Sequence, residues 1–224
     1  MFTLVPTVWS HEATRTYPVP ISCLMMLNCS GVIDKQFQDD RVRLQMWLDG
    51  PGFSGLVSQT FVPKHGLHDA KVATAVWITP GSYSVRLVWC SEVGDNGVPT
   101  FDFHGGPTLS PDPAAALNLN LWNAAARCEC LLHFNQSRAI VVKSRFMNDF
   151  LTDWAQTDME FRQIPSGNVN VYSTNQQREP DLHFEVSTTI DHDGTNSTVV
   201  SVNPSNHDAV GRYLEVSISS QWES

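Results

Sequence analysis

Hydrophobic and polar residues alternate most regularly between Gly81 and Cys90. Successive side chains of a β-strand point to opposite faces, so the apolar set and the polar set separate cleanly here. The apolar set is Tyr83, Val85, Leu87 and Trp89, and the polar set is Ser82, Ser84 and Arg86. An apolar face opposite a polar face along one long strand is typical of an antiparallel β-sandwich.

Other segments repeat this pattern. Residues 41–48 alternate well and end at the turn sequence Asp49-Gly50-Pro51-Gly52. Residues 128–134 and 139–143 are predicted to pair across a turn at 135–137, and residues 191–194 are predicted to form a hairpin turn. Further strands are expected at 21–27, 58–62, 100–103, 114–121, 168–172, 182–190, 198–202 and 212–219.

Two segments break the alternation and favour helices. Residues 145–161 carry apolar side chains at helical spacing, and residues 68–75 are a possible short helix. Residues 94–113 are rich in Gly and Pro and are expected to be largely irregular, as are residues 1–20 with three prolines. The predicted fold is an all-β, antiparallel jelly-roll β-sandwich with one or two short helices. It comprises an N-terminal arm at 1–20 and a single domain at 21–224.

Composition narrows the class of protein. Of the 224 residues, 42% are apolar and only 17% are charged, so a sizeable core can form. The formal net charge of -9 argues against a dedicated nucleic-acid binder. The densest positive charge is a local one, and it is a possible contact for RNA phosphates or simply a solvated strand end: Arg138, Lys143 and Arg145.

The five cysteines are odd in number and contain no Cys-x-x-Cys pair, so neither a zinc site nor a complete disulfide framework is predicted. Buried free thiols are expected, as in a reducing compartment. The chain begins without the pattern of a signal peptide and contains no apolar run long enough to cross a membrane.

Polar clusters that could support catalysis or metal binding are weak. Gly52-Phe53-Ser54-Gly55 lacks the second glycine of a serine-hydrolase elbow. His65 and His68 lack zincin spacing, and Asp191, His192 and Asp193 do not follow a calcium-loop pattern. Asp102 and His104 would share a strand face, where the carboxylate could orient the imidazole, but no nucleophile signature joins them. The sequence therefore predicts no catalytic residue, no metal and no cofactor.

Two tryptophans lie near the ends of the chain, outside the patterned segments. Trp9 and Trp222 have little core of their own to enter. We expect them either to dock on a neighbouring subunit or to fold back.

Residues 75–90 resemble a recurring feature of the coat proteins of picorna-like plant viruses of the comovirus and cheravirus type. Ala75, Val76 and Trp77 precede Gly81 and the long alternating strand. Pro80 makes the gap from Trp to Gly one residue longer than in that family. Two shorter stretches are similar to the family as well: Phe61-Val62-Pro63 and Arg212-Tyr213-Leu214-Glu215-Val216.

The resemblance implies a non-enzymatic capsid subunit, released from a polyprotein, that assembles with other capsid protein subunits into an icosahedral, pseudo-T=3 shell. Genomic RNA would fill the interior, no membrane would be involved, and the protein would be found in the virion and in the host cytoplasm during assembly. Two alternatives stay open. One is a carbohydrate- or ligand-binding β-sandwich module, and the other is an enzyme built on the Asp102/His104 or Asp191/His192 clusters.

Overall fold

The structure, a computed structural model, describes residues 2–4, 12–35, 42–62, 66–91, 100–123, 127–148, 154–164, 167–177, 183–192, 194, 197–206 and 212–220. The regular structure in these ranges consists of strands alone, which join into one 16-stranded assembly. The prediction of an all-β, antiparallel jelly-roll sandwich is confirmed. The short helices expected beside it are not found within the described ranges.

The first eight strands make one complete jelly roll. Their order is β5-β4-β7-β2 in one sheet and β6-β3-β8-β1 in the other, which is two interleaved Greek keys. The strands are β1 (Phe2–Leu4), β2 (Glu12–Val19), β3 (Cys23–Lys35), β4 (Val42–Gly50), β5 (Phe53–Val62), β6 (Gly66–Ile78), β7 (Gly81–Ser91) and β8 (Thr100–Ser110).

The next eight strands repeat the same order. The sheets are β10-β15-β12-β13 and β9-β16-β11-β14, so each strand of the second unit takes the place of its counterpart in the first. The strands are β9 (Asn118–Asn123), β10 (Cys128–His133), β11 (Arg138–Asn148), β12 (Trp154–Ile164), β13 (Val169–Gln177), β14 (His183–His192), β15 (Ser197–Asn206) and β16 (Arg212–Ser220). The chain therefore contains two jelly rolls where the sequence predicted one.

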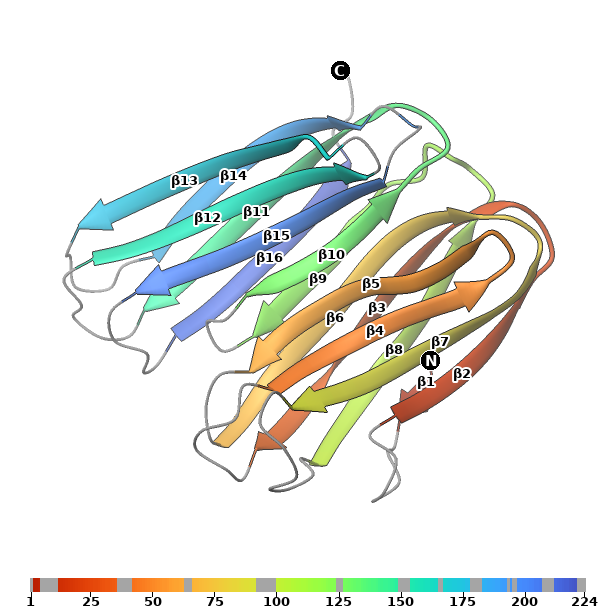
Figure 1. The fold of residues 1–224 in the computed structure, drawn as a ribbon, viewed down its shortest axis with the longest axis horizontal. Helices are drawn as coiled ribbons and strands as arrows, with labels where there is room; N and C mark the ends of the chain where they lie inside the picture. The colour runs from red at the N-terminus through yellow and green to blue at the C-terminus, as the bar shows by residue number, and fades with distance from the viewer. Residues whose placement is uncertain are drawn as a thin grey trace.

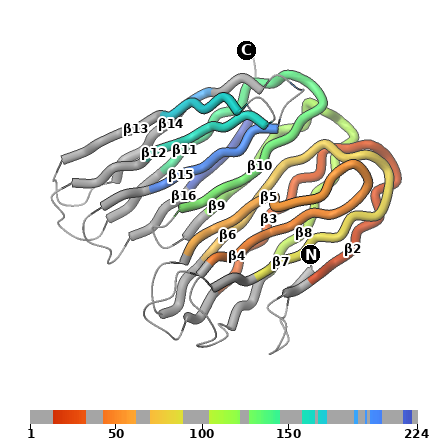
Figure 2. Tube along the Cα trace, in the orientation of Figure 1, coloured from red at the N-terminus to blue at the C-terminus, as the bar shows by residue number. Residues whose placement is uncertain are grey.

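The two jelly rolls lie side by side and their sheets are continuous (Figure 1). β5 pairs antiparallel with β10, which joins the sheet called here the β5 sheet. β6 meets β9 in the other sheet, called the β6 sheet, and also pairs parallel with the end of β10. Figure 2 shows the first unit in red to yellow-green on one side and the second in green to blue on the other.

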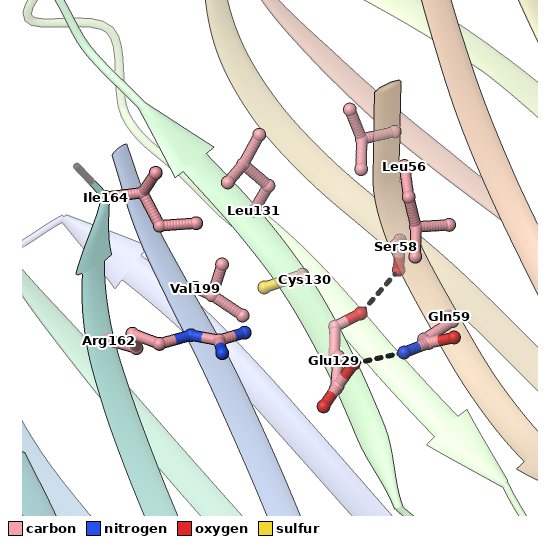
Figure 3. Close-up of a pocket in the computed structure, with 10 residues that line it drawn as sticks. Leu56, Ser58, Gln59, Glu129, Cys130, Leu131, Arg162, Ile164 and Val199 are labelled. Carbon is pink, nitrogen blue, oxygen red and sulfur yellow. Dashed lines mark hydrogen bonds between the residues drawn. The ribbon is translucent and has the colours of Figure 1, made fainter. Parts of the chain in front are cut away.

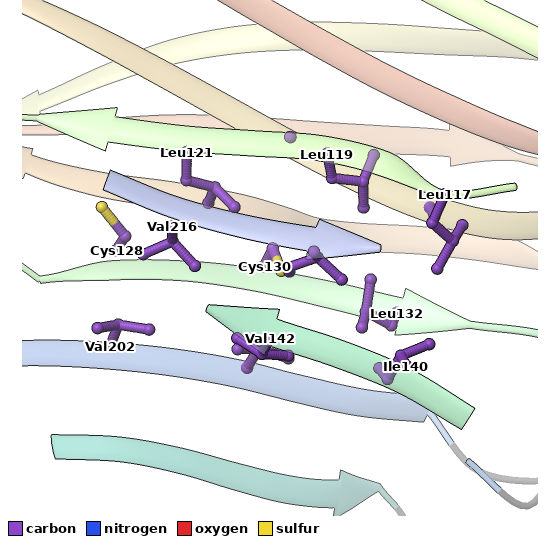
Figure 4. Packing of buried hydrophobic residues seen from close by; sticks show 14 of the residues in the cluster. Leu117, Leu119, Leu121, Cys128, Cys130, Leu132, Ile140, Val142, Val202 and Val216 are labelled. Carbon is purple, nitrogen blue, oxygen red and sulfur yellow. The ribbon is translucent and has the colours of Figure 1, made fainter. Parts of the chain in front are cut away.

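Each jelly roll has its own apolar core, and β6 contributes to both. Val72 and Val76 pack in the first core, whereas Ala73 and Ala75 face the second. A strand buried on both faces carries a continuous apolar run rather than an alternating one. For this reason residues 68–75 look unlike a strand in the sequence, and the helix predicted there is wrong. Figure 4 shows the second core, where leucines of β9 and valines of β11 and β16 from one sheet meet Cys128, Cys130 and Val202 of the other.

The second predicted helix is also wrong. Residues 145–161 span the end of β11 and most of β12, and residues 149–153 between them lie outside the described ranges. The apolar residues at helical spacing therefore come from two different strands. Phe161 is buried in the second core.

Residues expected to be irregular also form strands. β1 pairs with β8 and β2 pairs with β7, so both lie within the first jelly roll. Pro18 is tolerated because β2 is the last strand of its sheet among the described residues, where a missing N–H breaks no ladder. β8 covers residues 100–110, far beyond the short strand predicted at 100–103.

Two predicted hairpins are absent from the pairing. β10 and β11 flank the turn at 135–137 but lie in different sheets, and so do β14 and β15 on either side of Gly194. The predicted turn at residues 49–52 is confirmed between β4 and β5.

Candidate functional site

The seam between the two jelly rolls holds a connected cluster of polar side chains on the β5 sheet. Glu129, on the outward face of β10, forms an ion pair with Arg127 and accepts a hydrogen bond from Gln59 Nε2. Ser201 Oγ donates a further hydrogen bond to Glu129 Oε1 at 3.2 Å, and Arg127 Nε donates to Ser201 Oγ at 3.1 Å. Only 12% of the Glu129 side chain is exposed, so its charge depends on these partners.

This cluster continues across the seam into the first jelly roll. Gln45 Nε2 on β4 donates to Gln59 Oε1 at 3.2 Å, and Trp47 Nε1 donates to Gln45 Oε1 at the same distance. We call the row formed by Gln45, Gln59, Glu129 and Ser201 the seam ladder. It links β4, β5, β10 and β15 through side chains in addition to the backbone pairing, and so holds the two jelly rolls in a fixed alignment.

A shallow depression of about 200 Å³ lies beside the seam ladder. Its apolar wall is formed by Leu56, Leu131, Ile164 and Val199. Arg162 of β12 and Glu129 of β10 also line it (Figure 3). Among the described residues none forms a hydrogen bond or ion pair with the Arg162 guanidinium. The depression therefore offers apolar surface next to a cation.

The β6 sheet carries a second, more polar pocket of about 400 Å³ where β3, β8 and β9 meet. Asn28 Nδ2 donates to the Asn118 carbonyl at 3.4 Å, and Asn28 Oδ1 accepts from the Asn120 backbone N–H at 3.4 Å. Asn120 Nδ2 donates to Asn118 Oδ1 at 3.3 Å. Ser30, Lys71 and His104 complete the polar lining. Amides, a hydroxyl and two basic groups suit a small hydroxylated or anionic ligand.

Gly105 makes this pocket possible. Its φ is +150°, and a Cβ added there would lie 2.0 Å from the Asn28 carbonyl oxygen and 2.7 Å from Cys29 Cα. Both contacts are with backbone, which cannot rotate away. Glycine is therefore required for β8 to approach β3 and bring His104 to the pocket.

The three basic residues predicted as RNA contacts do not share one surface. Arg138 Nη2 donates to the Ala115 carbonyl at 2.7 Å and to Ser220 Oγ at 3.1 Å, and its guanidinium lies 4.7 Å from the centre of the Phe134 ring. Partial burial lowers its pKa from the ordinary value.

Lys143 is exposed on the outer face of β11. Arg145 stands in register between Glu185 of β14 and Glu215 of β16. Contact of these three basic residues with RNA stays a prediction.

The other predicted candidate residues lie on different strands and do not form one site. Asp102 and His104 are both on β8. His104 is exposed in the polar pocket, and Asp102 occupies a register position opposite Val32. Ser54 Oγ donates to Asp49 Oδ1 at 2.6 Å, and Arg86 Nε holds Asp49 at 3.0 Å, so Ser54 supports a turn.

The two His-containing clusters lie in β14 and β6. Asp191 and His192 are in β14, opposite Ala139 and Arg138, and His68 is opposite Ile33. His65, Asp193, Trp9 and Trp222 lie outside the described residues. In the described part of the chain, no three His, Cys, Asp or Glu side chains are grouped as a metal site would need.

Four cysteines are buried and free: Cys23, Cys29, Cys128 and Cys130. Burial raises the pKa of the Cys29 and Cys128 thiols to about 12 and also raises the pKa of Cys130. Because the thiolate is the reactive form, these groups are poor nucleophiles in the folded chain. The prediction that Cys128 and Cys130 share a strand face is confirmed, since both enter the second core.

Sequence reasoning missed the seam ladder and the asparagine cluster. One signal for the ladder was present, because Arg127 and Glu129 fall on the outward face of a strand whose inward face carries Cys128 and Cys130. The partners Gln45, Gln59 and Ser201 come from distant strands, and only the topology brings them together. In the described part of the structure, no helix has the length and apolar character of a membrane span.

No protein-family model and no curated protein sequence matches this chain. Solved structures that match this chain weakly include the tandem CBM22-1–CBM22-2 domains of Paenibacillus barcinonensis Xyn10C. That match has 10% identity and a TM-score of 0.30, and covers 97% of this chain and 85% of the other. PNGF-II matches with 7% identity and a TM-score of 0.35, over 100% of this chain and 66% of that one.

The VP2 subviral particle of infectious bursal disease virus matches with 7% identity and a TM-score of 0.30, over 96% of this chain and 73% of that one. The matched structures thus include a viral capsid protein and carbohydrate-binding modules. At these levels of similarity, neither function can be transferred to this chain.

Proposed function

We infer that this chain is a structural coat-protein subunit, which assembles with other capsid protein subunits into an icosahedral shell around RNA. The observation that carries this proposal is the fusion of two complete jelly rolls into one sandwich with continuous sheets. A shell subunit must keep its shape while its surfaces bind neighbours. Continuous backbone pairing across β5 and β10, reinforced by the seam ladder, supplies that rigidity.

The finer assignment rests on the resemblance of residues 75–90 to coat proteins of the comovirus and cheravirus type. In the structure this stretch is the end of β6, a turn and β7, and it contributes Val76, Tyr83, Val85 and Leu87 to the first core. We propose a pseudo-T=3 particle on this basis, with the protein in the virion and, during assembly, in the host cytoplasm. We propose no enzymatic activity.

Co-expression with the coat proteins encoded beside it tests the proposal. Sedimentation and electron microscopy should reveal closed particles, and RNA inside them should survive nuclease treatment that degrades free RNA. Omission of this chain should abolish the closed particles. A chain that stays monomeric in every combination, or particles that form equally well without it, would contradict the proposal.

A second candidate function is a ligand-binding module, and the asparagine-lined pocket on the β6 sheet favours it. Asn28, Asn118 and Asn120 present amide groups to a space of about 400 Å³. Amides commonly hydrogen-bond sugar hydroxyl groups, so a glycan array is the direct test. Dose-dependent binding that disappears in Asn120→Ala, and survives in the control Arg162→Ala on β12 of the opposite sheet, would support this function. An array without any such binding would remove it.

A further inference from the structure

Two valines of β13, Val169 and Val171, point to the solvent-exposed outer face of the sandwich instead of its core. Val169 and Val171 are 48% and 57% exposed on the outer face, while the inward-facing position Asn170 stands opposite the buried Phe161. In an alternating strand the apolar side chains normally face the core. The register is fixed for this reason, since a shift of one residue would turn the whole apolar set to solvent. Valines on the outer face indicate a surface that something else covers.

The neighbouring strand extends this surface. Ile164 on β12 is 45% exposed, and it lines the apolar depression beside the seam ladder. The register of β12 against β13 sets Arg162 beside Val169 and Glu160 beside Val171. These five residues, Glu160, Arg162, Ile164, Val169 and Val171, define what we call the β12–β13 surface. Among the described residues it holds half of the large exposed apolar side chains, namely three of six.

The two charged residues of this surface, Glu160 and Arg162, could pair with the same two residues of a second copy. Glu160 and Arg162 are two residues apart on one strand, so both point outward, and among the described residues neither side chain has a hydrogen-bond or ion-pair partner. Consider a second copy related by a two-fold axis that lies in the contact plane and crosses β12 between these residues. That axis sets each Glu160 opposite the other copy's Arg162. It also sets each Val169 opposite the other copy's Val171, because each valine is level with one of the charges.

We propose that the β12–β13 surface binds a second copy of this chain in a two-fold contact. Two reciprocal ion pairs then lie along β12, next to two reciprocal valine contacts along β13, and Ile164 lies at the rim. A second copy is the occupant that fits this pattern. Its β12 strand runs in the opposite direction across the two-fold axis, so its Arg162 meets Glu160 and its Glu160 meets Arg162. The inference rests on the proposed function, in which this contact links neighbouring shell subunits.

Charge reversal tests the contact. Glu160→Arg alone sets arginine against arginine, and Arg162→Glu alone sets glutamate against glutamate. Each single variant should weaken self-association by about tenfold or more in sedimentation velocity. The double variant E160R/R162E restores opposite charges and should associate within a few-fold of the original chain. An equimolar mixture of the two single variants should form a mixed dimer, although neither variant pairs with itself.

The controls separate this contact from general effects of charge. Lys143→Glu changes the net charge as much as Arg162→Glu does, on an exposed position of β11, and should leave association unchanged. All variants alter exposed or half-buried side chains, so their circular dichroism and urea midpoints should stay close to those of the original chain.

A monomeric original chain at tens of micromolar would overturn the inference, as would single variants that associate normally or a mixture that stays monomeric. Association lost only in Ser173→Pro, which blocks backbone pairing at the β13 edge, would overturn it too. Shell formation is scored for the same variants after co-expression with the other capsid protein subunits. Shells built by non-pairing variants would refute the contact and leave the capsid function standing. Pairing without any shell would refute the capsid function instead.

Discussion

Gly105→Ala tests how β8 is placed against β3. The added Cβ would lie 2.0 Å from the Asn28 carbonyl oxygen and 2.7 Å from Cys29 Cα, far inside van der Waals contact. Both atoms belong to the backbone of β3, so relief requires the two strands to separate. Gly55→Ala is the matched control, because Gly55 has a similar φ of +156° and a Cβ added there would meet nothing within 4 Å.

Both substitutions place an alanine at a positive φ, but only Gly105→Ala also creates a steric clash. A positive φ of this kind costs an alanine about 1–2 kcal/mol. Reduced entropy of the unfolded chain offsets about 0.4–1 kcal/mol of this. At Gly105, strand separation also weakens two or three backbone hydrogen bonds at about 0.5–1.5 kcal/mol each. We therefore expect Gly55→Ala to destabilise by about 1 kcal/mol and Gly105→Ala by about 3–5 kcal/mol.

Urea denaturation followed by tryptophan fluorescence measures this difference. In a chain of this size 1 kcal/mol corresponds to roughly 2–4 °C in Tm, so a thermal scan should separate the variants as well. Hydrogen exchange should show faster exchange in β3 and β8 of Gly105→Ala and unchanged exchange in β12. Equal destabilisation by the two substitutions would refute the close approach of β8 to β3.

Three further predictions concern the seam, the basic residues and the thiols. Glu129→Ala leaves its hydrogen-bond donors without an acceptor, and urea denaturation should show a loss of about 1–3 kcal/mol, moderated because its ion-pair partner is 43% exposed. Arg138→Ala should lower stability by about 1–3 kcal/mol, whereas Lys143→Ala should change it by less than about 0.5 kcal/mol, and an equal loss in both would contradict the structural role of Arg138. The Cys29 and Cys128 thiols have folded pKa values of about 12 against an ordinary value of 9.0, so their contribution to stability is complete below pH 9 and declines as the pH rises towards 12. A flat urea midpoint across that range would contradict their burial.

The alternating strands were predictable because one face of each strand contacts solvent and the other packs in the core. β4 and β7 follow this rule, and Tyr83, Val85 and Leu87 are buried as their spacing predicts. β6 could not be recognised in the same way, since packing on both faces removes the alternation. Only the first part of β8 was predicted, because Gly105, Gly106 and Pro107 indicate a loop in sequence, although the glycine at 105 serves close strand packing.

The pairing of strands was less accessible than their existence. Turn residues at 135–137 show that the chain reverses, but they do not show that β11 crosses to the other sheet. For the same reason Glu129 could be placed on an outward face, while its partners on β5 and β15 could not be foreseen. Arg138 was predicted as an exposed basic residue, yet the linker before β9 folds over it and accepts its hydrogen bond through Ala115.

Electron microscopy of material from cells that express this chain together with its proposed partner coat proteins tests the central proposal most directly. We predict closed icosahedral shells in which density for this chain fits two adjoining jelly rolls and which protect RNA from nuclease. Open aggregates, or shells without density for a double jelly roll, would contradict the proposal.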